Sequence, residues 1–524
     1  MSRAVSIRDY LTEMYQKGIT DYWMPPAVKY AKGRPLGRIN DSDCVIFACR
    51  RGEREIQLTE ALTQPDFSGF VRSRVPKTYF FPLIEYHEKF RNLIPLLPTE
   101  RVRMPLGKVL EQAGIRQIRA AEAEKFAHVT FFFDGRNEEV ADCEYVRFDI
   151  SKENYHIDLA DQLMRFVETV KENHQQKYEF MLINFAAGDI LGHVPDFLRQ
   201  VMCAEAVDLA LGSLVRWAQE SELTIIITAD HGLLEQAFLP DGSFSIAHTA
   251  AKVPFILIPP TEPEGIYLRS GGSLADVAPT VLNLFGIAQS PEMTGESLLI
   301  LNNNEKISTK GVVLVVLDGW GIGVNDPLIN PIFAARIPNL EKYINSYPYT
   351  ELFAAGEHVG LLPGSPGNSE TGHLTLGAGR VVIQDEVRIP EAIKKGELLS
   401  HTNFHELLMR TAFRQNAVHV LMLLSEQSSH GSIGETLGIL EAIKYHRIDQ
   451  VFIHCILDGR SAPPRAAIDL IEKFGKDLKT LEIGEIVTIV GRGFALDRSG
   501  DYQNTTQIAY EAFIDGKGYP VCVL

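Results

Sequence analysis

The feature that most constrains the fold is a series of short, β-branched apolar runs that alternate with longer helical stretches. Four such runs stand in the middle of the chain: EFMLINF (179–185), LTIIITA (223–229), VPFILI (253–258) and VVLVVL (312–317). Between them, DFLRQVMCAEAVDLALGSLVRWAQES has apolar residues at helical spacing. Strands that are apolar throughout are buried on both faces, which is typical of a mainly parallel sheet covered by helices. The sequence therefore predicts an α/β fold.

The same rhythm returns near both ends of the chain. VHVLMLLSEQSSH, DQVFIHCILDGR and EIVTIVGR lie in the last third, and DCVIFACRRGER lies near the beginning. We predict that these four runs form one second sheet, although they are far apart in sequence. A chain of 524 residues is also too long for one ordinary core. We therefore expect a continuous domain at 100–385 and a smaller domain made of residues 1–99 and 386–524.

The expected boundaries lie in segments of turn-forming or polar composition. The Pro-rich stretch 93–107 and the stretch after LGAGRVVIQDE (376–386) are candidate hinges. The segment 299–311, rich in Asn and Lys, is predicted to be a surface connector.

Composition bounds the partners that the chain can have. The net charge of −16 argues against a nucleic acid, because a phosphate backbone requires a basic face. No apolar run approaches the roughly 18 residues of a membrane-spanning helix, and MSRAVSIRDYLTEMYQKG lacks the layout of a secretory signal. The six cysteines show no CxxC spacing, which fits reduced thiols. We expect a cytoplasmic protein without a nucleic-acid or membrane partner, and a monomer.

Residues that can ligate metal ions follow the apolar runs of the middle domain, where the carboxyl ends of parallel strands meet. Seven side chains make up this set: Asp189, His193, Asp230, His231, His248, Asp318 and Ser369. Asp189 and His193 are four residues apart, so one helical turn places both on the same face. The side chains of Asp230 and His231 diverge because the two residues are neighbours in sequence, so the pair can ligate two adjacent ions, or one ion if the loop is bent. Mixed carboxylate and imidazole ligands suit manganese or zinc better than calcium. The plainer interpretation, that these residues only cap helices or form hydrogen bonds, is disfavoured because all seven stand in matching contexts.

Ser369, in GNSETGH, is the candidate nucleophile. A serine hydroxyl is almost never ionised at neutral pH, and a bound divalent ion would activate it. The Gly-Asn-Ser-Glu stretch ahead of a helical segment also favours an anion through free backbone N–H groups. The alternative is that Ser369 is only a helix N-cap. Together with the ligand set, the motif predicts an enzyme that acts on phosphate.

Several segments closely resemble the cofactor-independent (2,3-bisphosphoglycerate-independent) phosphoglycerate mutases of the alkaline phosphatase superfamily. They cover nearly the whole chain: LDGWG, GNSETGHLTLGAGR, LDGR, EKFAHVTFFF, NFAAGDILGH, ITADHG, AHT and PEMTGESL. The resemblance implies an alkaline-phosphatase-like metal domain and a smaller substrate domain, each a mainly parallel sheet with helices on both faces. In the family LDGWG opens the protein and the MTGxSL segment closes it, whereas here MTGESL precedes LDGWG. The order resembles a circular permutant cut inside the substrate domain.

The resemblance also implies the roles of particular residues. One ion would be held by Asp189, His193 and His248, and a second by Asp318, Asp230, His231 and Ser369. We expect two divalent ions, Mn²⁺ first, with Zn²⁺, Co²⁺ or Mg²⁺ as alternatives. The implied substrate-binding set is basic: Arg51, Arg54, Lys125, His430, Arg460, Arg492 and Arg498, with His430 near the phosphoryl group. Any single arginine could instead be a solvated surface residue. His128, in FAHVTFFF, is interpreted as structural, at the entry of an aromatic strand.

The implied reaction interconverts 3-phosphoglycerate and 2-phosphoglycerate through a phosphoserine at Ser369. Three departures from the family lie in the substrate domain. Ser461 stands where the family has an aspartate that looks like its acid–base group, and nearby Asp458 is expected to face elsewhere. SEQSSHGSI keeps only His430, and DRSGDYQN keeps Arg498 but loses a downstream Arg-Trp.

Three hypotheses therefore remain open. The first is a phosphoglycerate mutase, which the retained basic residues favour. The second is a metal-dependent phosphomonoesterase or phosphomutase for a different small phosphorylated acid, which Ser461 favours. The third is a non-catalytic binding protein, which the complete ligand set disfavours.

Overall fold

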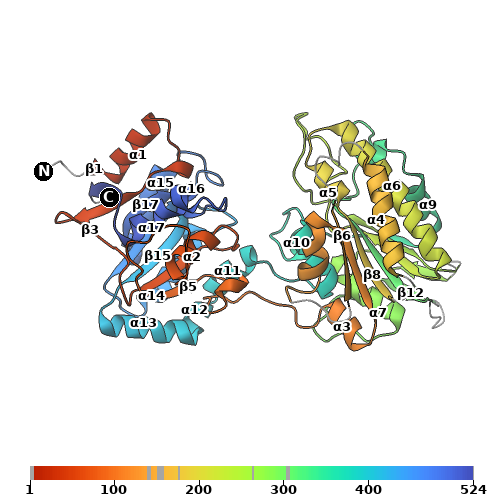
Figure 1. Cartoon of the computed structure of the whole chain (residues 1–524), viewed down its shortest axis with the longest axis horizontal. Helices are drawn as coiled ribbons and strands as arrows, with labels where there is room; N and C mark the ends of the chain where they lie inside the picture. The colour runs from red at the N-terminus through yellow and green to blue at the C-terminus, as the bar shows by residue number, and fades with distance from the viewer. Residues whose placement is uncertain are drawn as a thin grey trace. The chain divides into compact units, whose positions relative to one another are not determined.

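The computed structural model divides into two compact units, shown in Figure 1. Unit 1 comprises Met1–Thr99 and Asp385–Leu524, and unit 2 comprises Glu100–Gln384. The residues described are 5–137, 143–149, 158–174, 178–261, 265–301, 307 and 309–522. The predicted connector 299–311 lies partly outside these residues. Each unit has its own hydrophobic core.

Unit 2 is built on a seven-stranded sheet with the order β14-β10-β9-β13-β8-β6-β7. Its strands are β6 (Gln117–Glu122), β7 (Cys143–Phe148), β8 (Phe180–Phe185), β9 (Thr224–Thr228), β10 (Val253–Ile258), β13 (Val312–Leu317) and β14 (Tyr349–Leu352). The four strands predicted in this region are confirmed. Strands β9, β13, β8, β6 and β7 are parallel, while β10 runs antiparallel to both of its neighbours. A separate pair joins β11 (Ile266–Leu268) and β12 (Leu299–Leu301).

Strand β13 comes last of the parallel strands along the chain but lies in the middle of the sheet. It pairs with β8 on one side and with β9 on the other. Leu317 stands opposite Phe185 of β8, and Val316 stands opposite Thr228 of β9. Because the three strands end at the same level, the residues that follow them meet at one edge of the sheet.

Two groups of helices cover the sheet of unit 2 (Figure 1). One group is α4 (Leu159–His174), α6 (Phe197–Glu220) and α9 (Pro338–Ser346), and the other is α3 (Leu106–Gln112), α7 (Val277–Phe285) and α10 (Ser369–Ala378). Shorter helices are α5 (Ala187–Gly192) and α8 (Pro331–Ala334). The predicted helix after β8 is confirmed as α6, which begins where Asp196 accepts a hydrogen bond from the backbone of Arg199.

The aromatic run after Lys125 is not a strand, contrary to the expectation for FAHVTFFF. Residues His128–Phe132 form a single π-helical turn. Helix α10 packs so closely here that a Cβ on Gly377 would lie 1.8 Å from the carbonyl oxygen of Phe133. Tertiary packing of this kind overrides the strand preference of aromatic and β-branched residues.

Unit 1 contains a nine-stranded sheet with the order β1-β18-β2-β17-β16-β15-β4-β5, and β3 pairs with β2. Its strands are β1 (Val5–Ser6), β2 (Ala27–Ala31), β3 (Arg34–Pro35), β4 (Cys44–Ala48), β5 (Tyr79–Pro82), β15 (Val418–Leu424), β16 (Val451–Leu457), β17 (Glu485–Gly491) and β18 (Tyr519–Cys522). The four predicted strands are neighbours in one parallel ladder, β17-β16-β15-β4, which confirms that both ends of the chain build one sheet.

The helices of unit 1 connect its parallel strands, and these connections step across the sheet in two opposite directions. They are α1 (Ile7–Gln16), α2 (Ile56–Thr63), α11 (Asp385–Lys394), α12 (Glu397–Ser400), α13 (Thr402–Arg414), α14 (Ile433–Lys444), α15 (Ala467–Leu481), α16 (Arg492–Ala495) and α17 (Gln507–Ile514). The connections from β15 through α14 to β16 and through α15 to β17 step one way across the sheet, while β4 through α2 to β5 steps the other way. The carboxyl ends of β15 and β4 therefore form a topological switch point, where open α/β sheets bind ligands.

None of the helices in the described ranges combines the length and the apolar surface that crossing a membrane requires.

Candidate active site

Three neighbouring strand ends bring acidic side chains together in unit 2. Asp189 lies in α5 directly after β8, Asp318 follows β13, and Asp230 with His231 follows β9. Because β13 lies between β8 and β9, Asp318 stands between the other two carboxylates. Asp230, His231 and Asp318 are fully buried. The order of strands in the sheet, rather than their order along the chain, assembles the site.

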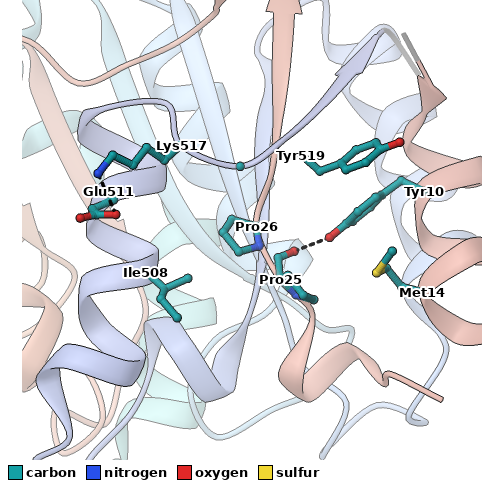
Figure 2. A pocket seen from close by; sticks show the side chains of 9 residues that line it. Tyr10, Met14, Pro25, Pro26, Ile508, Glu511, Lys517 and Tyr519 are labelled. Carbon is teal, nitrogen blue, oxygen red and sulfur yellow. Dashed lines mark hydrogen bonds and ion pairs between the residues drawn. The ribbon is translucent and has the colours of Figure 1, made fainter. Parts of the chain in front are cut away.

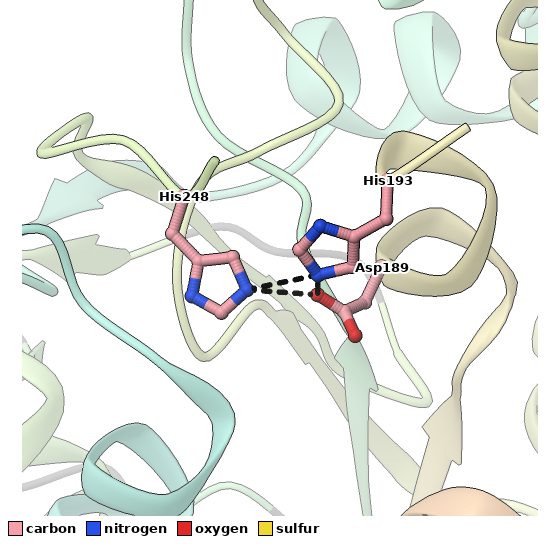
Figure 3. A group of neighbouring side chains, drawn as sticks. All are labelled: Asp189, His193 and His248. Atoms are coloured by element: carbon pink, nitrogen blue, oxygen red, sulfur yellow. Dashed lines mark hydrogen bonds and ion pairs between the residues drawn. The ribbon is translucent and has the colours of Figure 1, made fainter. Parts of the chain in front are cut away.

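Asp189, His193 and His248 form one potential ligand group (Figure 3). The Nε2 atoms of the two histidines lie 3.2 Å apart, and that of His248 lies 3.2 Å from Oδ1 of Asp189. Their Nδ1 atoms lie 2.7 and 2.9 Å from the backbone carbonyls of Ile246 and Gly367. Nδ1–H of each ring donates to its carbonyl, so the Nε2 atoms are the ring nitrogens that face Asp189. This is the arrangement of a site that binds a cation.

Asp230, Asp318, His231 and Ser369 form a second, deeper group. Nε2 of His231 lies 3.0 Å from Oγ of Ser369 and 3.4 Å from Oδ1 of Asp318. The Ser369 hydroxyl lies 3.2 Å from the same oxygen of Asp318. Asp189 links the two groups, since its Oδ1 is 3.7 Å from Nε2 of His231. All seven predicted ligands are thus brought together around two adjacent positions.

Ser369 is the first residue of α10, and the preceding residue caps the helix. The side chain of Asn368 accepts a hydrogen bond from the backbone N–H of Thr371, at 3.0 Å. The capping role considered for Ser369 therefore belongs to Asn368, which leaves the Ser369 hydroxyl free to face the ligand groups. Helix α10 approaches closely because of Gly372, where a Cβ would lie 2.5 Å from the carbonyl oxygen of Asp230.

Lys125 lies inside the ligand cluster of unit 2. Its Nζ is 2.5 Å from Oγ of Ser369, 2.8 Å from Oδ1 of Asp318 and 2.7 Å from Oδ2 of Asp189. Burial by itself would lower the pKa of this ammonium group, but the surrounding carboxylates outweigh it and raise the pKa above its ordinary value. The positively charged ammonium group of Lys125 therefore lies beside Oγ of Ser369, the candidate nucleophile.

The sequence interpretation missed His373 and Asn184. His373 is fully buried, with Nδ1 3.0 Å from the backbone oxygen of Ser369 and 3.2 Å from Oδ2 of Asp230. Asn184, at the end of β8, donates to Oδ2 of Asp318 at 2.8 Å. The signal for His373 was available, since it follows Ser369 by one helical turn in GNSETGH.

The charges within the cluster keep its carboxylate side chains ionised. Burial opposes ionisation of Asp189, but hydrogen bonds from His193 and His248 outweigh it and hold its pKa well below the usual range. The pKa of Asp318 is also lowered, because Lys125 and His231 outweigh its burial. Burial lowers the pKa of His231, but Asp230 and Asp318 prevail and raise it to about 9. Both carboxylates are ionised at neutral pH.

These donors fit divalent ions. Among the described residues, Oδ1 of Asp189 and Oδ2 of Asp230 are buried and have only histidine nitrogens beside them, from His193 and His248 for Asp189 and from His373 for Asp230. Buried carboxylate oxygens are normally satisfied, and a cation would satisfy both. Carboxylate and imidazole ligands at two adjacent positions match the preferences of manganese, zinc and related ions. The site can therefore hold divalent metal beside a serine hydroxyl.

The other predicted basic residues follow the parallel strands of unit 1. His430 follows β15, Arg51 and Arg54 follow β4, Arg460 follows β16, and Arg492 and Arg498 follow β17. His430, Arg54 and Arg492 are buried, whereas Arg51, Arg460 and Arg498 are exposed. Arg54 donates to the backbone oxygen of Leu496 at 3.1 Å, and Arg498 pairs with Glu53 at 2.9 Å.

Asp458 is buried beside Arg492 and the backbone of position 461. Its Oδ1 forms a buried ion pair with Arg492, and its Oδ2 accepts hydrogen bonds from the backbone of Ser461 and Ala462, at 3.0 and 2.9 Å. The carboxylate must neutralise a guanidinium that is only 1% exposed. The Ser461 hydroxyl contacts Oγ of Ser428 at 3.2 Å. The altered position 461 therefore touches the altered loop that carries His430.

An apolar pocket in unit 1 contains none of the predicted residues (Figure 2). It has a volume of about 420 Å³ and lies beside Tyr10 and Tyr519, whose rings stack with their centroids 4.9 Å apart. Its two charged lining residues, Glu511 and Lys517, pair with each other at 3.1 Å. The pocket offers no group for phosphate chemistry.

Two family descriptions match the chain. "Metalloenzyme superfamily" matches residues 28–289, which is half of the chain, and "BPG-independent PGAM N-terminus (iPGM_N)" matches residues 389–521. The crystal structure of Leishmania mexicana phosphoglycerate mutase at low cobalt concentration aligns with a TM-score of 0.41 and 26% identity, covering 52% of this chain and 53% of that one.

Curated relatives carry one shared name, 2,3-bisphosphoglycerate-independent phosphoglycerate mutase. The protein from Thermomicrobium roseum is 38% identical over 55% of this chain and 56% of its own length. The protein from Moorella thermoacetica is 36% identical over 57% of this chain and 58% of its own length. The chain thus spans slightly more than half the length of the curated relatives it matches. With a metal-ligand cluster in unit 2 and an iPGM_N module in unit 1, the chain belongs to the Metalloenzyme superfamily.

Proposed function

We propose that the chain is a cofactor-independent phosphoglycerate mutase that interconverts 3-phosphoglycerate and 2-phosphoglycerate through a phosphoserine. The observation that carries this proposal is the surroundings of Ser369. Its Oγ lies 2.5 Å from Nζ of Lys125, 3.0 Å from Nε2 of His231 and 3.2 Å from Oδ1 of Asp318. The shared name of the curated relatives supports the same activity.

Unit 2 supplies the phosphoryl-transfer half of the reaction. When bound, two divalent ions, Mn²⁺ in the first place, would neutralise charge on the phosphoryl group and lower the pKa of the serine hydroxyl. Asp318 accepts the hydrogen bond of that hydroxyl and so orients Oγ for attack on phosphorus. Lys125 balances the charge that develops on the oxygen, and Ser369 begins α10, a position where free backbone N–H groups favour an anion. The ligands of the two ions are those of the two groups described above.

Unit 1 supplies the groups that bind the organic acid. Guanidinium groups recognise carboxylate and phosphate in paired, directional contacts. Arg51, Arg460 and Arg498 are exposed after parallel strands and carry this role, while buried Arg54 and Arg492 hold the loops around them. His430 stands among them.

The arrangement of the chain belongs to the same proposal. The iPGM_N match follows the Metalloenzyme match along this chain, which supports a circularly permuted order. The net charge of −16 supports a small substrate rather than a nucleic acid. Action as a monomer in the cytoplasm completes the proposal, and light scattering after gel filtration measures the oligomeric state.

A Ser369→Ala variant tests the proposed nucleophile. We expect it to lose all mutase and phosphatase activity while binding Mn²⁺ and unfolding at the temperature of the wild type, because only one ligand oxygen is removed. Phosphorus NMR of 3-phosphoglycerate incubated with Mn²⁺ and protein measures the products. Ser365→Ala is the matched control, since the Ser365 backbone accepts a hydrogen bond from Gly356 and the substitution leaves that contact in place. Turnover by the Ser369 variant would point to a different nucleophile.

A metal-dependent phosphomonoesterase or phosphomutase for another small phosphorylated acid is the second candidate. It is favoured by Ser461, whose hydroxyl contacts Ser428 and cannot carry a proton to and from a substrate near neutral pH. The same NMR experiment separates the candidates. Appearance of 2-phosphoglycerate supports the mutase, inorganic phosphate supports the phosphatase, and neither product with Mn²⁺ bound supports a binding protein.

A further inference from the structure

Glu55 and His430 meet at the topological switch point of unit 1. His430 lies in the loop after β15, and Glu55 lies directly before α2 in the segment after β4. Strands β15 and β4 are parallel neighbours, and the chain leaves them in opposite directions across the sheet. Ligands of open α/β sheets bind in the crevice at such a position. The two residues therefore occupy the place in unit 1 where a substrate is expected.

The pair has the geometry of a carboxylate that orients an imidazole. Oε1 of Glu55 lies 3.3 Å from Nδ1 of His430. Glu55 is fully buried and His430 is 5% exposed. Oε2 of Glu55 has no other partner within the described residues, and Nε2 of His430 makes no hydrogen bond there. A proton on Nδ1 donated to Glu55 leaves a lone pair on Nε2, as in hydrolase triads.

Backbone contacts hold His430 in this position. The N–H of Arg50 donates to the backbone oxygen of His430 at 2.9 Å, and Nη2 of Arg50 donates to the backbone oxygen of Ser428 at 2.8 Å. The N–H of His430 donates to Oγ of Ser428 at 3.3 Å. Glu55 is fixed because its N–H donates to the backbone oxygen of Gly52 at 3.1 Å. Both partners therefore sit on anchored loops.

The neighbouring carboxylates are committed to other contacts. Asp458 pairs with Arg492 and accepts two backbone N–H groups. Glu435 lies 3.3 Å from Arg50 and accepts the N–H of Ser432 in a capping box. Ser428 and Ser461 carry only hydroxyls. Of these groups, Glu55 with His430 is the pair that can exchange a proton with a ligand.

We propose that His430 is the acid–base catalyst for the hydroxyl groups of the bound hydroxy acid and that Glu55 is its positioning residue. This inference rests on the proposed mutase function. A glycerate hydroxyl that attacks the phosphorus of a phosphoserine gives up its O–H proton, and Nε2 of His430 is the atom of unit 1 that can take it. The new O–P bond forms, and the bond from phosphorus to Oγ breaks with its electron pair left on Oγ. In the reverse direction, protonated His430 returns the proton to the departing glycerate oxygen.

The electrostatic environment supports a shared proton. Burial raises the pKa of Glu55, while its hydrogen bond and charge interaction with His430 lower it, with a net rise. Cys49, Tyr86 and Arg50 lie nearest the pair, and the other charged groups of the adjoining elements have partners of their own: Arg54, Glu435, Asp458 and Arg492. Burial raises the pKa of both Cys49 and Tyr86 well above their ordinary values, which keeps these two groups neutral. Asp458 and Arg492 pair with each other, as do Arg50 and Glu435.

A Glu55→Gln substitution in the Mn²⁺-loaded full-length protein tests the pair. General acid–base catalysis contributes on the order of 10²–10⁴ in rate, so we expect kcat with 3-phosphoglycerate to fall about 100-fold while KM stays within about twofold. p-Nitrophenyl phosphate provides the comparison, because p-nitrophenolate leaves without protonation. The ratio of mutase turnover to p-nitrophenyl phosphate turnover should fall about 100-fold in Glu55→Gln. The pH dependence of kcat should also change shape.

Glu60→Gln is the matched control, since it makes the same substitution on α2 at a residue that contacts Lys89 and Tyr502. It should retain the wild-type ratio and pH profile. An unchanged ratio in Glu55→Gln would overturn the role of the pair. A wild-type protein that turns over p-nitrophenyl phosphate but not 3-phosphoglycerate would instead overturn the mutase function.

A wild-type measurement keeps the inference testable if Glu55→Gln does not fold. In protein labelled with ¹⁵N-histidine, with His430 assigned through a His430→Gln variant, the ring nitrogen shifts report the tautomer. We expect the proton on Nδ1 and a free lone pair on Nε2. A neutral ring with its proton on Nε2 would show that Glu55 does not orient His430, and would overturn the proposal.

Discussion

Binding of a divalent ion beside Ser369 should release a proton from His231. Asp230 and Asp318 outweigh burial and raise the pKa of His231 to about 9, so in the metal-free protein this ring is protonated at neutral pH. A protonated imidazole cannot ligate a metal, and metal and proton therefore compete for Nε2. Asp189 raises the pKa of His193, which adds to the competition in the same direction.

The size of the effect follows from the pKa of His231. Below a pKa of about 9, the apparent affinity for the ion should fall about tenfold for each pH unit, or about 1.4 kcal/mol. Between pH 8.5 and pH 6.5 the loss from His231 alone is therefore about 100-fold, or about 2.7 kcal/mol. At pH 7.5 nearly one proton per protein should be released from His231 when Mn²⁺ binds.

Titration calorimetry measures this release directly. Mn²⁺ is titrated into metal-free protein at pH 7.5 in two buffers of different ionisation enthalpy, and the difference in heat gives the number of protons. Repeating the titration at pH 6.5 and 8.5 gives the slope of affinity against pH. A His231→Gln variant should release fewer protons and show a flatter slope. Proton release near zero, with an affinity independent of pH, would refute the competition.

Three further predictions concern buried groups. Lys125→Met should slow phosphoserine formation, measured by rapid quench, on the order of 10²–10³-fold because the charge beside the nucleophile is lost; a rate within threefold of wild type would contradict this. His373→Gln should weaken Mn²⁺ binding about 10–100-fold in the same calorimetry, because Nδ1 of His373 no longer orients Asp230; unchanged affinity would show that the contact is dispensable. His419 and His454 are fully buried, with Nδ1 of His419 3.0 Å from Nε2 of His454, and burial lowers the pKa of both rings. The unfolded chain therefore binds more protons below pH 6.5, and each histidine should remove about 1.4 kcal/mol of stability per pH unit as pH falls from 6.5 toward its folded pKa. Urea unfolding at pH 7.5 and 5.5 measures this loss, His454→Asn should reduce it, and equal stability at the two pH values would exclude it.

The strands and the chemistry at their ends could be read from sequence because both are local signals. Each buried run is apolar throughout, and the polar residue that follows it marks the end of the strand. Asp230, Asp318 and Asp189 were found in this way, and the structure brings them to one edge of the unit 2 sheet. His373 was within reach of the same reasoning, as the next residue on the Ser369 face of α10.

Other parts depend on packing between distant segments. Lys125 reaches Ser369 across 244 residues of sequence, and Glu55 reaches His430 across 375. No spacing rule connects such pairs until the strand order is known. The π-helical turn at His128–Phe132 also depends on distant packing, because its composition favours a strand while α10 packs closely against the residue that follows the turn.

Because β13 lies in the middle of the unit 2 sheet, the ion site is complete only when β13 has paired with both neighbouring strands. Residues 312–317 follow β9 by about 80 residues in the chain, yet they pair with both β8 and β9, which come earlier in the sequence. Such distant pairings form slowly, since a long loop has to close before any contact rewards it. Until then Asp189 and Asp230 lack the carboxylate that stands between them. A bound divalent ion would therefore stabilise, by mass action, the molecules in which β13 lies between β8 and β9.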